Sequence, residues 1–388
     1  MVDKKLFALV VATMTIGVIF SYSLSTYISI QDNLKISFLI KQFGAAVIGI
    51  VAMGIMSRMD PDKALAKIGV MLFALFLFLM AMMPLLPSSI VPMINGAKRW
   101  INIGVTNLSP AEFFKIGFIY FLAWSFSRKF YYKDEEHRLR DEIKLFVPYV
   151  VVLAIACFLI VVMQNDLGQA IVICATLSVM LLFAGSSFRL FLSILLAGAV
   201  GAIVFIVYSS YRLNKVLQWW ASIQDYILSS LPAFMADYLR VERNTLDEAY
   251  QATQSLNAIN NGGLFGQGLG NSVFKLGYVS DIHTDFVLAG IIEETGFLGA
   301  GVIAFLIISI IHRIFKIANR SENPVFYLFC VGIASMIGFQ FLMNALGISG
   351  VMPIKGITVP FISYGGSSLL SLSIAIGMVL MISKKAKM

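Results

Sequence analysis

The sequence predicts an all-α protein whose helices cross a membrane several times. Hydrophobic residues make up 59% of its 388 positions, charged residues only 13%, and the mean hydropathy is +0.86. A water-soluble chain of this length could not bury so much apolar surface. The apolar runs are continuous and do not alternate with a period of two, so we expect membrane-spanning helices and not a β-barrel.

Ten apolar stretches are long enough to cross a bilayer as helices. They lie near residues 7–29, 37–57, 66–86, 111–127, 146–163, 168–185, 189–209, 285–312, 325–346 and 365–383. The first is too long for the apolar core of a signal peptide and has no clear cleavage site, so we expect it to be retained as a span.

The distribution of Lys and Arg predicts the orientation. With the N-terminus in the cytoplasm, most of the 29 Lys and Arg residues lie in or beside cytoplasmic segments, as the positive-inside rule requires. Ten spans then place both termini in the cytoplasm. A large loop between the seventh and eighth spans, residues 210–284, becomes extracytoplasmic, and we expect short helices within it. Residues 1–388 are expected to form a single integral membrane domain.

Several function classes are excluded by their missing motifs. The chain has no Walker A loop, G-x-G-x-x-G fingerprint, H-E-x-x-H pair or C-x-x-C pair. An extracytoplasmic site also lacks ATP, so bond formation there needs a substrate activated beforehand, and downhill transport is the other option. The net charge of +8 reflects membrane orientation, so nucleic acid is not an expected partner.

The first of the candidate polar clusters on the external side lies at residues 95–115. Lys98 and Arg99 could hold a phosphate or pyrophosphate, and Trp100 could stack on a sugar, although an interfacial belt is the simpler interpretation. Glu112 and Lys115 lie three residues apart at the start of a span. We expect them to pair and to face the interior of the bundle, with a structural role as well supported as a functional one.

Further polar positions lie in later loops. Asp166 lies in a tight turn and is most simply the cap of the next helix. The glycines of residues 262–272 permit close backbone approach to a ligand, or simply form turns. Two prolines and three glycines in residues 352–366 break the helix before the last span, and such a backbone must lie against protein or a wet cavity. Lys355 in that segment could meet a phosphate or extend toward the membrane surface.

The stretch 280–299 joins a polar loop to a very apolar helix. Asp281, His283 and Asp285 lie at the junction, where ionisable residues beside a membrane helix often mark a functional site. A purely structural alternative is that Thr284 caps the helix and Asp285 complements the helix dipole from the first turn. The two interpretations are compatible, because both need an ionised carboxylate.

Seven motifs in order resemble the SEDS family (shape, elongation, division, sporulation) of polytopic peptidoglycan polymerases, over essentially the whole chain. The motifs are Gly96–Ile101, Ser109–Lys115, Gln164–Gly168, Tyr211–Arg212, Tyr250–Leu256, His283–Phe286 and Pro353–Ser368. Lys355, two residues after a proline, and the run Gly266–Ser272 resemble the division member of the family more than the elongation member.

The chain departs from the family pattern at three places. Ser280–Ile282 replaces the usual Pro-Glu-x before His283, and Asn165 stands where the family has proline. The loop between Arg212 and Tyr250 is longer, with an apolar segment near residues 226–240. These departures affect the expected loop geometry and leave the acid at position 285 in place.

The resemblance implies that the protein polymerises lipid II into glycan strands at the outer leaflet of the bacterial cytoplasmic membrane, during septal synthesis in cell division. An undecaprenyl-pyrophosphate-linked glycan is the donor and lipid II the acceptor. Asp285 would act as general base on the acceptor hydroxyl. The leaving pyrophosphate would be stabilised, in decreasing order of expectation, by Arg212, Lys98, Arg99 and Lys355.

The resemblance also assigns supporting positions and partners. Substrate contacts are implied for Trp100, His283, Thr284, Gln254 and Ser363, and supporting roles for Glu112, Lys115, Asp166 and Asn344. No cofactor is certain; a divalent cation, Mg²⁺ or Mn²⁺, on the pyrophosphate fits the chemistry, and the metal ligands are unknown. The implied partners are a class B penicillin-binding protein, which is the transpeptidase, and other divisome proteins.

Three alternatives stay open on the sequence. A lipid II flippase or transporter would fit the Glu112–Lys115 pair and the broken helices, although no internal repeat is evident. An elongation-type polymerase and a non-enzymatic scaffold of a division complex are the other two.

Overall fold

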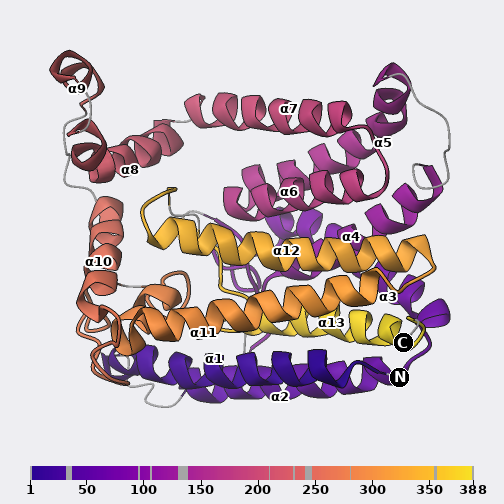
Figure 1. The fold of residues 1–388 in the computed structure, drawn as a ribbon, viewed down its shortest axis with the longest axis horizontal. Coiled ribbons are helices and arrows are strands. Elements are labelled where there is room, and N and C mark those ends of the chain that lie inside the picture. Colours follow the sequence, from indigo (N-terminus) through magenta and orange to yellow (C-terminus); the bar gives the residue numbers. More distant parts are fainter. Residues whose placement is uncertain are drawn as a thin grey trace.

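The computed structural model is dominated by long helices that run side by side (Figure 1). It describes residues 2–31, 37–94, 97–104, 107–129, 139–208, 210–229, 232–240, 247–279, 281–353 and 356–386.

Each of the ten predicted spans coincides with a helix. These are α1 (Lys4–Gln31), α2 (Ser37–Arg58), α3 (Pro61–Met82), α4 (Pro110–Lys129), α5 (Leu139–Cys157) continued by the π-helix η2 (Phe158–Met163), α6 (Leu167–Phe183), α7 (Phe188–Val207), α11 (Val287–Ala318), α12 (Pro324–Ile348) and α13 (Gly366–Ser383). Eight of these described helices are long and apolar enough to cross a membrane, and the other two are α4 and α6. The multi-pass, all-helical membrane fold is therefore confirmed, while the number of ten spans stays a prediction.

Short polar side chains begin several of the spans. Asp60 accepts a hydrogen bond from the backbone amide of the first turn of α3, and Asn323 does the same for α12, each followed by a proline at the first helical position. Ser187 caps α7 in the same way. Such caps satisfy amides that have no partner within the helix, which is why an apolar run starts as a helix at these residues.

Small residues let the central helices approach closely. α2 packs on α13, α3 on α4, and α12 on α4, α6 and α11. A Cβ at Gly117 of α4 would lie 2.2 Å from the Phe73 nitrogen of α3, so only glycine permits this contact. α7, in contrast, exposes most of its apolar side chains, as a helix in contact with lipid does.

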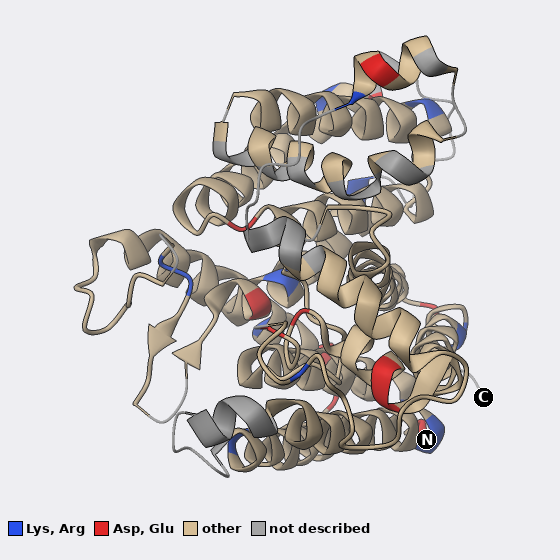
Figure 2. Ribbon diagram, turned by 90° about the vertical axis from the view of Figure 1, so that its left-hand side faces the viewer, with Lys and Arg blue, Asp and Glu red and all other residues tan. Residues whose placement is uncertain are grey.

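The two ends of the bundle differ. Both termini lie at one end in Figure 1, where the Asp3 amide donates to Ser383 Oγ at 3.1 Å and its carboxylate pairs with Arg313. The opposite end carries the short helices predicted in the long loop: α8 (Ser210–Leu228), α9 (Ala233–Leu239) and α10 (Asp247–Gly262). Figure 2 looks onto that end, where acidic and basic segments lie near one another in the middle of the view.

Little other regular structure is present in the described residues. A 3₁₀ turn, η1 (Met83–Leu85), follows α3. Two short antiparallel strands, β1 (Ile101–Asn102) and β2 (Asn107–Leu108), pair with Ile101 opposite Leu108. This hairpin lies in the predicted loop 87–110, between α3 and α4.

A sharp break divides α11 at Gly296, whose φ is 72°. The glycine-rich run 262–268 fills this break. The amides of Gln267 and Gly268 donate to the carbonyls of Glu293 and Glu294, both at 2.9 Å, and complete the first half of the helix. A Cβ at Gly266 would lie 2.3 Å from the Glu294 carbonyl oxygen. Gly266, and likewise Gly262, therefore permit a close approach to the protein's own backbone.

Candidate functional site

The loop of residues 281–286, just before α11, carries Asp285 and is held rigidly by its backbone. Three successive carbonyl oxygens of this loop accept hydrogen bonds from other elements. The pairs are Tyr364 N to His283 O (2.9 Å), Ser363 Oγ to Thr284 O (2.7 Å) and Asn344 Nδ2 to Asp285 O (2.6 Å). Because backbone carbonyls anchor the loop, the Asp285 side chain is not needed to hold the loop in place.

Residues 357–365, which include the Ser363 and Tyr364 contacts of this loop, are themselves held from two sides. Asn344 of α12 also donates to the carbonyl of Ile357 at 2.6 Å. Gln42 of α2 donates to the Ser363 carbonyl and accepts from the Gly365 amide, both at 3.2 Å. We did not predict Gln42 from the sequence, although a buried amide inside an apolar span is a signal that could have found it.

The irregular backbone before α13 lies deep in the bundle. A Cβ at Gly17, near the middle of α1, would lie 2.5 Å from the carbonyl oxygen of Phe361. The prediction that this broken segment lies against protein is therefore confirmed.

Asp285 is a largely buried carboxyl group surrounded by other acids. Burial is the main cause that raises its pKa, to about 7, and the negative charges of Asp281 and Asp166 raise it further, while the positive charge of Arg99 lowers it. Gly356, with φ +63°, leaves the space beside the carboxylate: a Cβ there would lie 3.2 Å from Asp285 Oδ2. A carboxyl group with a pKa near 7 can accept a proton from a substrate and release it again.

Arg99 and Asp166 reach Asp285 from two other parts of the chain. Arg99 donates from Nε to the Gln164 carbonyl at 2.7 Å and from Nη2 to the Asn165 carbonyl at 2.8 Å. Burial raises the pKa of Asp166, and Arg99 lowers it. The predicted capping role of Asp166 is confirmed, because its Oδ1 accepts from the Gln169 amide that begins α6.

A buried ion pair lies beside this cluster. Lys115 Nζ and Glu112 Oε2 are 2.9 Å apart in the interior, as predicted from their spacing. Gln169 joins the two, accepting from Lys115 at 2.6 Å and donating to Glu112 at 2.8 Å. The Gln169 backbone amide also donates to Asp166 Oδ1, so the pair is connected to the acids around Asp285. Gln169 was not predicted; its signal is a polar residue in the first turn of an apolar helix.

The alternative in which Thr284 and Asp285 serve the helix start is wrong. α11 begins at Val287 with Phe286 at the N-cap, and neither residue lies in the first turn. The Thr284 hydroxyl donates instead to the Asp281 carbonyl at 3.2 Å. Asp285 lies outside the helix because the tight turn from Asp281 to Phe286 delays the helix start.

His283 packs against two aromatic rings that also contact each other. The ring centroids of Phe38 and Tyr364 are 5.2 Å and 5.6 Å from that of His283. Burial lowers the pKa of the imidazole, against the charge of Asp281, so the neutral form is favoured. Its Nδ1 is buried without a hydrogen-bond partner among the described residues.

The other predicted substrate contacts are less concentrated. Lys98 Nζ donates to the carbonyls of Pro84, in η1, and Leu86, which follows η1. Trp100 is partly exposed before β1, and Gln254 lies on α10, where its Oε1 accepts from Asn257. The buried Ser363 hydroxyl donates to the Thr284 carbonyl and accepts from the Val359 amide at 2.8 Å, so both bonds are to the protein. Lys355 and the side chain of Arg212 lie outside the described part of the chain.

The predicted divalent cation finds no cluster of ligands in the described residues. They contain no group of three or more His, Cys, Asp or Glu side chains placed to hold a metal ion. We therefore derive no step through a cation.

Comparisons with known proteins agree along the whole chain. The family model described as "Cell cycle protein", for FtsW, RodA and SpoVE, matches residues 3–388. A Helicobacter pylori protein named "Probable peptidoglycan glycosyltransferase FtsW" is 44% identical over 388 residues, covering 99% of each chain. "Stage V sporulation protein E" of Bacillus subtilis is 30% identical over 388 residues, covering 99% of this chain and 98% of its own.

Solved structures show the same fold. A chain from the study "Structural coordination of polymerization and crosslinking by a peptidoglycan synthase complex" aligns with a TM-score of 0.72 at 24% identity, over 99% of this chain and 98% of that one. The rod shape determining protein RodA of Thermus thermophilus aligns with a TM-score of 0.65 at 23% identity, over 100% and 98%. With the family model and the full-length relatives, these matches show that the chain belongs to the FtsW/RodA/SpoVE family, the family of the SEDS proteins.

Proposed function

We propose that this protein is a peptidoglycan glycosyltransferase that polymerises lipid II, with Asp285 as the general base. The observation that carries the proposal is the position of Asp285, a largely buried carboxyl group among other acids on a loop anchored through three consecutive carbonyls. Burial and the neighbouring acids raise its pKa to about 7. The names of the relatives, FtsW glycosyltransferases above all, support the same activity.

The reaction needs no ATP, because the donor already carries a pyrophosphate leaving group. A hydroxyl of the lipid II sugar attacks the anomeric carbon of the growing glycan and forms the new glycosidic bond. The bond from that carbon to the pyrophosphate breaks, and the polyprenyl pyrophosphate leaves with the bonding electrons. Asp285 takes the hydroxyl proton as the bond forms, which a base with a pKa near the working pH does efficiently.

Arg99 is the described cation best placed for the leaving group. Its charge acts on both Asp285 and Asp166, so it lies close to the reacting end of the site. A guanidinium matches the oxygens of pyrophosphate in a bidentate geometry. His283 stays a predicted substrate contact, although its Nδ1 is buried within the protein. Lys355 and Arg212 stay predicted contacts of the pyrophosphate.

The names of the family relatives support a cellular setting for this activity. The greater similarity to proteins named FtsW supports a role in cell division, in the cytoplasmic membrane at the septum. A class B penicillin-binding protein that crosslinks the strands is the expected partner, together with other divisome proteins. A polyprenyl tail fits a protein whose α7 offers an apolar surface to the membrane.

The test is polymerisation of lipid II by purified protein with its transpeptidase partner. Asp285→Asn should fold and make no glycan strands. Asp281→Asn is the matched control, since it removes a neighbouring acid of the same loop, and it should keep polymerising. Strand synthesis by Asp285→Asn at the wild-type rate would show that the base is another group. A flippase would instead move labelled lipid II across liposomes with either substitution, and a scaffold would support growth with both.

A further inference from the structure

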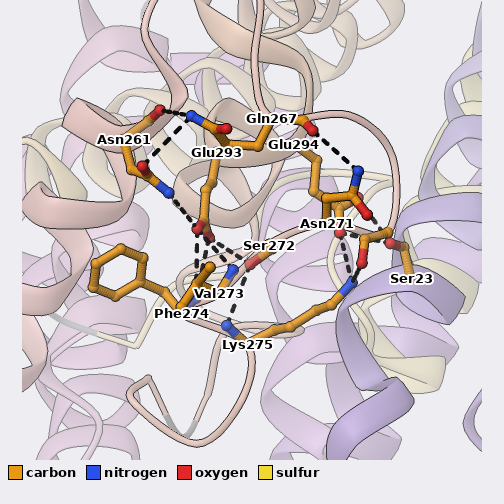
Figure 3. Close-up of polar contacts among 11 residues, drawn as sticks. Ser23, Asn261, Gln267, Asn271, Ser272, Val273, Phe274, Lys275, Glu293 and Glu294 are labelled. Atoms are coloured by element: carbon orange, nitrogen blue, oxygen red, sulfur yellow. Dashed lines mark hydrogen bonds and ion pairs between the residues drawn. The ribbon is translucent and has the colours of Figure 1, made fainter.

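Two adjacent glutamates on α11, Glu293 and Glu294, are buried just before the break at Gly296 (Figure 3). Their exposed fractions are 0% and 1%. Two carboxylates inside a membrane protein are costly unless each is fully paired. The mechanism above uses neither of them, so their pairing needs its own explanation.

Glu293 is surrounded by hydrogen-bond donors from the end of the long loop. The donors are Asn261 Nδ2 (2.9 Å), Val273 N (2.9 Å), Phe274 N (3.4 Å) and Ser272 Oγ. A carboxylate only accepts hydrogen bonds, so it matches all four of them. An amide in its place would turn an NH₂ group toward the donors on one side, either those on Oε1 or those on Oε2.

Glu294 extends the same arrangement to α1. Its carboxylate accepts from Lys275 Nζ at 3.0 Å and from the Ser23 hydroxyl at 2.7 Å. Lys275 also donates to the carbonyl of Gly270 at 2.6 Å. The two glutamates therefore join three elements: the loop of residues 261–275, the first segment of α11, and α1.

This first segment, residues 287–295, begins two residues after Asp285. It is too short to be stable as an isolated helix, so its place is set by its contacts. Asn344 and the turn at residues 363–364 hold the loop before it, and the four donors hold Glu293 near its far end. We propose that Glu293 is a positioning residue, whose carboxylate fixes this segment to the loop and so sets where Asp285 lies. The proposal rests on Asp285 as the base.

Glu293 acts on Asp285 through position and not through its charge. The charged groups that act on the Asp285 carboxyl are Asp281 of the same loop, Asp166 at the start of α6, and Arg99 before β1, and His283 is the other titratable group of the loop. If the first segment of α11 shifts, Asp285 becomes less buried, and its pKa falls toward that of an ordinary carboxyl group.

The test compares Glu293→Gln with Glu142→Gln in the full-length protein with its partner. Glu142 is also a buried glutamate that accepts from a serine hydroxyl and a backbone amide, both of Ser187, but it lies on α5 beside the start of α7. We expect Glu293→Gln to lower kcat by about 100-fold and to change KM for lipid II by less than about twofold. The acid limb of its pH–rate profile should move to lower pH, whereas Glu142→Gln should not move the limb.

Ser272→Ala is the milder variant, because it removes one donor and leaves three. It should shift kcat and the acid limb in the same direction as Glu293→Gln, by less, and it replaces Glu293→Gln if that protein does not fold. A wild-type acid limb in a folded variant, whatever its kcat, would overturn the proposal and leave Glu293 a structural residue. Asp285→Asn, measured in parallel, separates this outcome from failure of the proposed function. Strand synthesis by that variant would show that Asp285 is not the base.

Discussion

Asp285 owes its properties to residues that are far apart in the sequence. Asp281 is four residues away, but Asp166 and Arg99 come from loops more than a hundred residues earlier. The sequence predicted each of these groups as a polar residue in a loop between apolar spans. It could not predict that they meet, because the meeting depends on how the helices pack. The burial that raises the pKa of Asp285 likewise comes from the packed bundle.

The rate of polymerisation should depend on the charge state of Asp285. The base must be deprotonated, so activity should rise with pH through about 7, the pKa of this group. Asp166→Asn removes a charge that raises this pKa, and the acid limb should move to lower pH. Arg99→Gln removes a charge that lowers it, and the limb should move to higher pH. A pH–rate profile for the three proteins measures the midpoints, and shifts of equal sign would contradict the assignment.

Gly356 should not tolerate a side chain. Alanine there would place Cβ 3.2 Å from Asp285 Oδ2 and force a φ of +63° on a residue that disfavours it. We expect Gly356→Ala to lose about 100-fold in polymerisation rate. Gly104→Ala is the control, because Gly104 also has positive φ, at +89°, with nothing within 4 Å of its Cβ position. If both variants lose activity equally, backbone strain and not the carboxylate contact is responsible.

The helices show where pattern predicts structure well and where it does not. Long apolar runs predicted the ten helices, because the bilayer demands internal hydrogen bonding. The π-helical turn η2 and the break in α11 were not predicted, since each depends on a partner. η2 leads into the turn that carries Asp166 beside Arg99, which agrees with the frequent use of π-bulges at functional sites. The glycine-rich run was predicted to approach a ligand or to form turns. The sequence could not show that it packs against the break in α11.

The ion pair at the start of α4 should matter most when only half of it is removed. Lys115→Met leaves Glu112 buried without its cation, and we expect a loss of about 3–5 kcal/mol in the free energy of unfolding. The double variant Glu112→Leu, Lys115→Met removes both charges and should be more stable than the single one. Unfolding in detergent, followed by circular dichroism, compares the three proteins. A double variant as unstable as Lys115→Met would show that the pair itself is needed.

At the scale of the whole molecule, the described structure places both termini at one end of the bundle and the long loop at the other. This agrees with the arrangement predicted from the positive-inside rule, but the side of the membrane stays a prediction. Composition alone predicted the membrane class, because no soluble fold could hold so many apolar side chains. The number of spans is harder to predict, because α4 carries a buried ion pair and α6 has only 17 residues.

Cysteine labelling tests the orientation directly. The native Cys157, Cys174 and Cys330 are first replaced to give an unreactive background. Tyr238→Cys, on the exposed helix α9, should then react with a membrane-impermeant maleimide added outside intact cells. Asn319→Cys, at the end of α11, should react only after the membrane is opened. The reverse pattern would mean that the protein is inserted the other way round.

The anchoring of the Asp285 loop has a consequence for how the protein is made. Its backbone is held by α12 and by the turn before α13, and that turn is held in its place by Gln42 of α2. A ribosome must therefore deliver nearly the whole chain before the loop can take its shape. With Asp285 as the proposed base, an incomplete copy left by interrupted translation is expected to start no glycan strand, because its loop lacks these anchors.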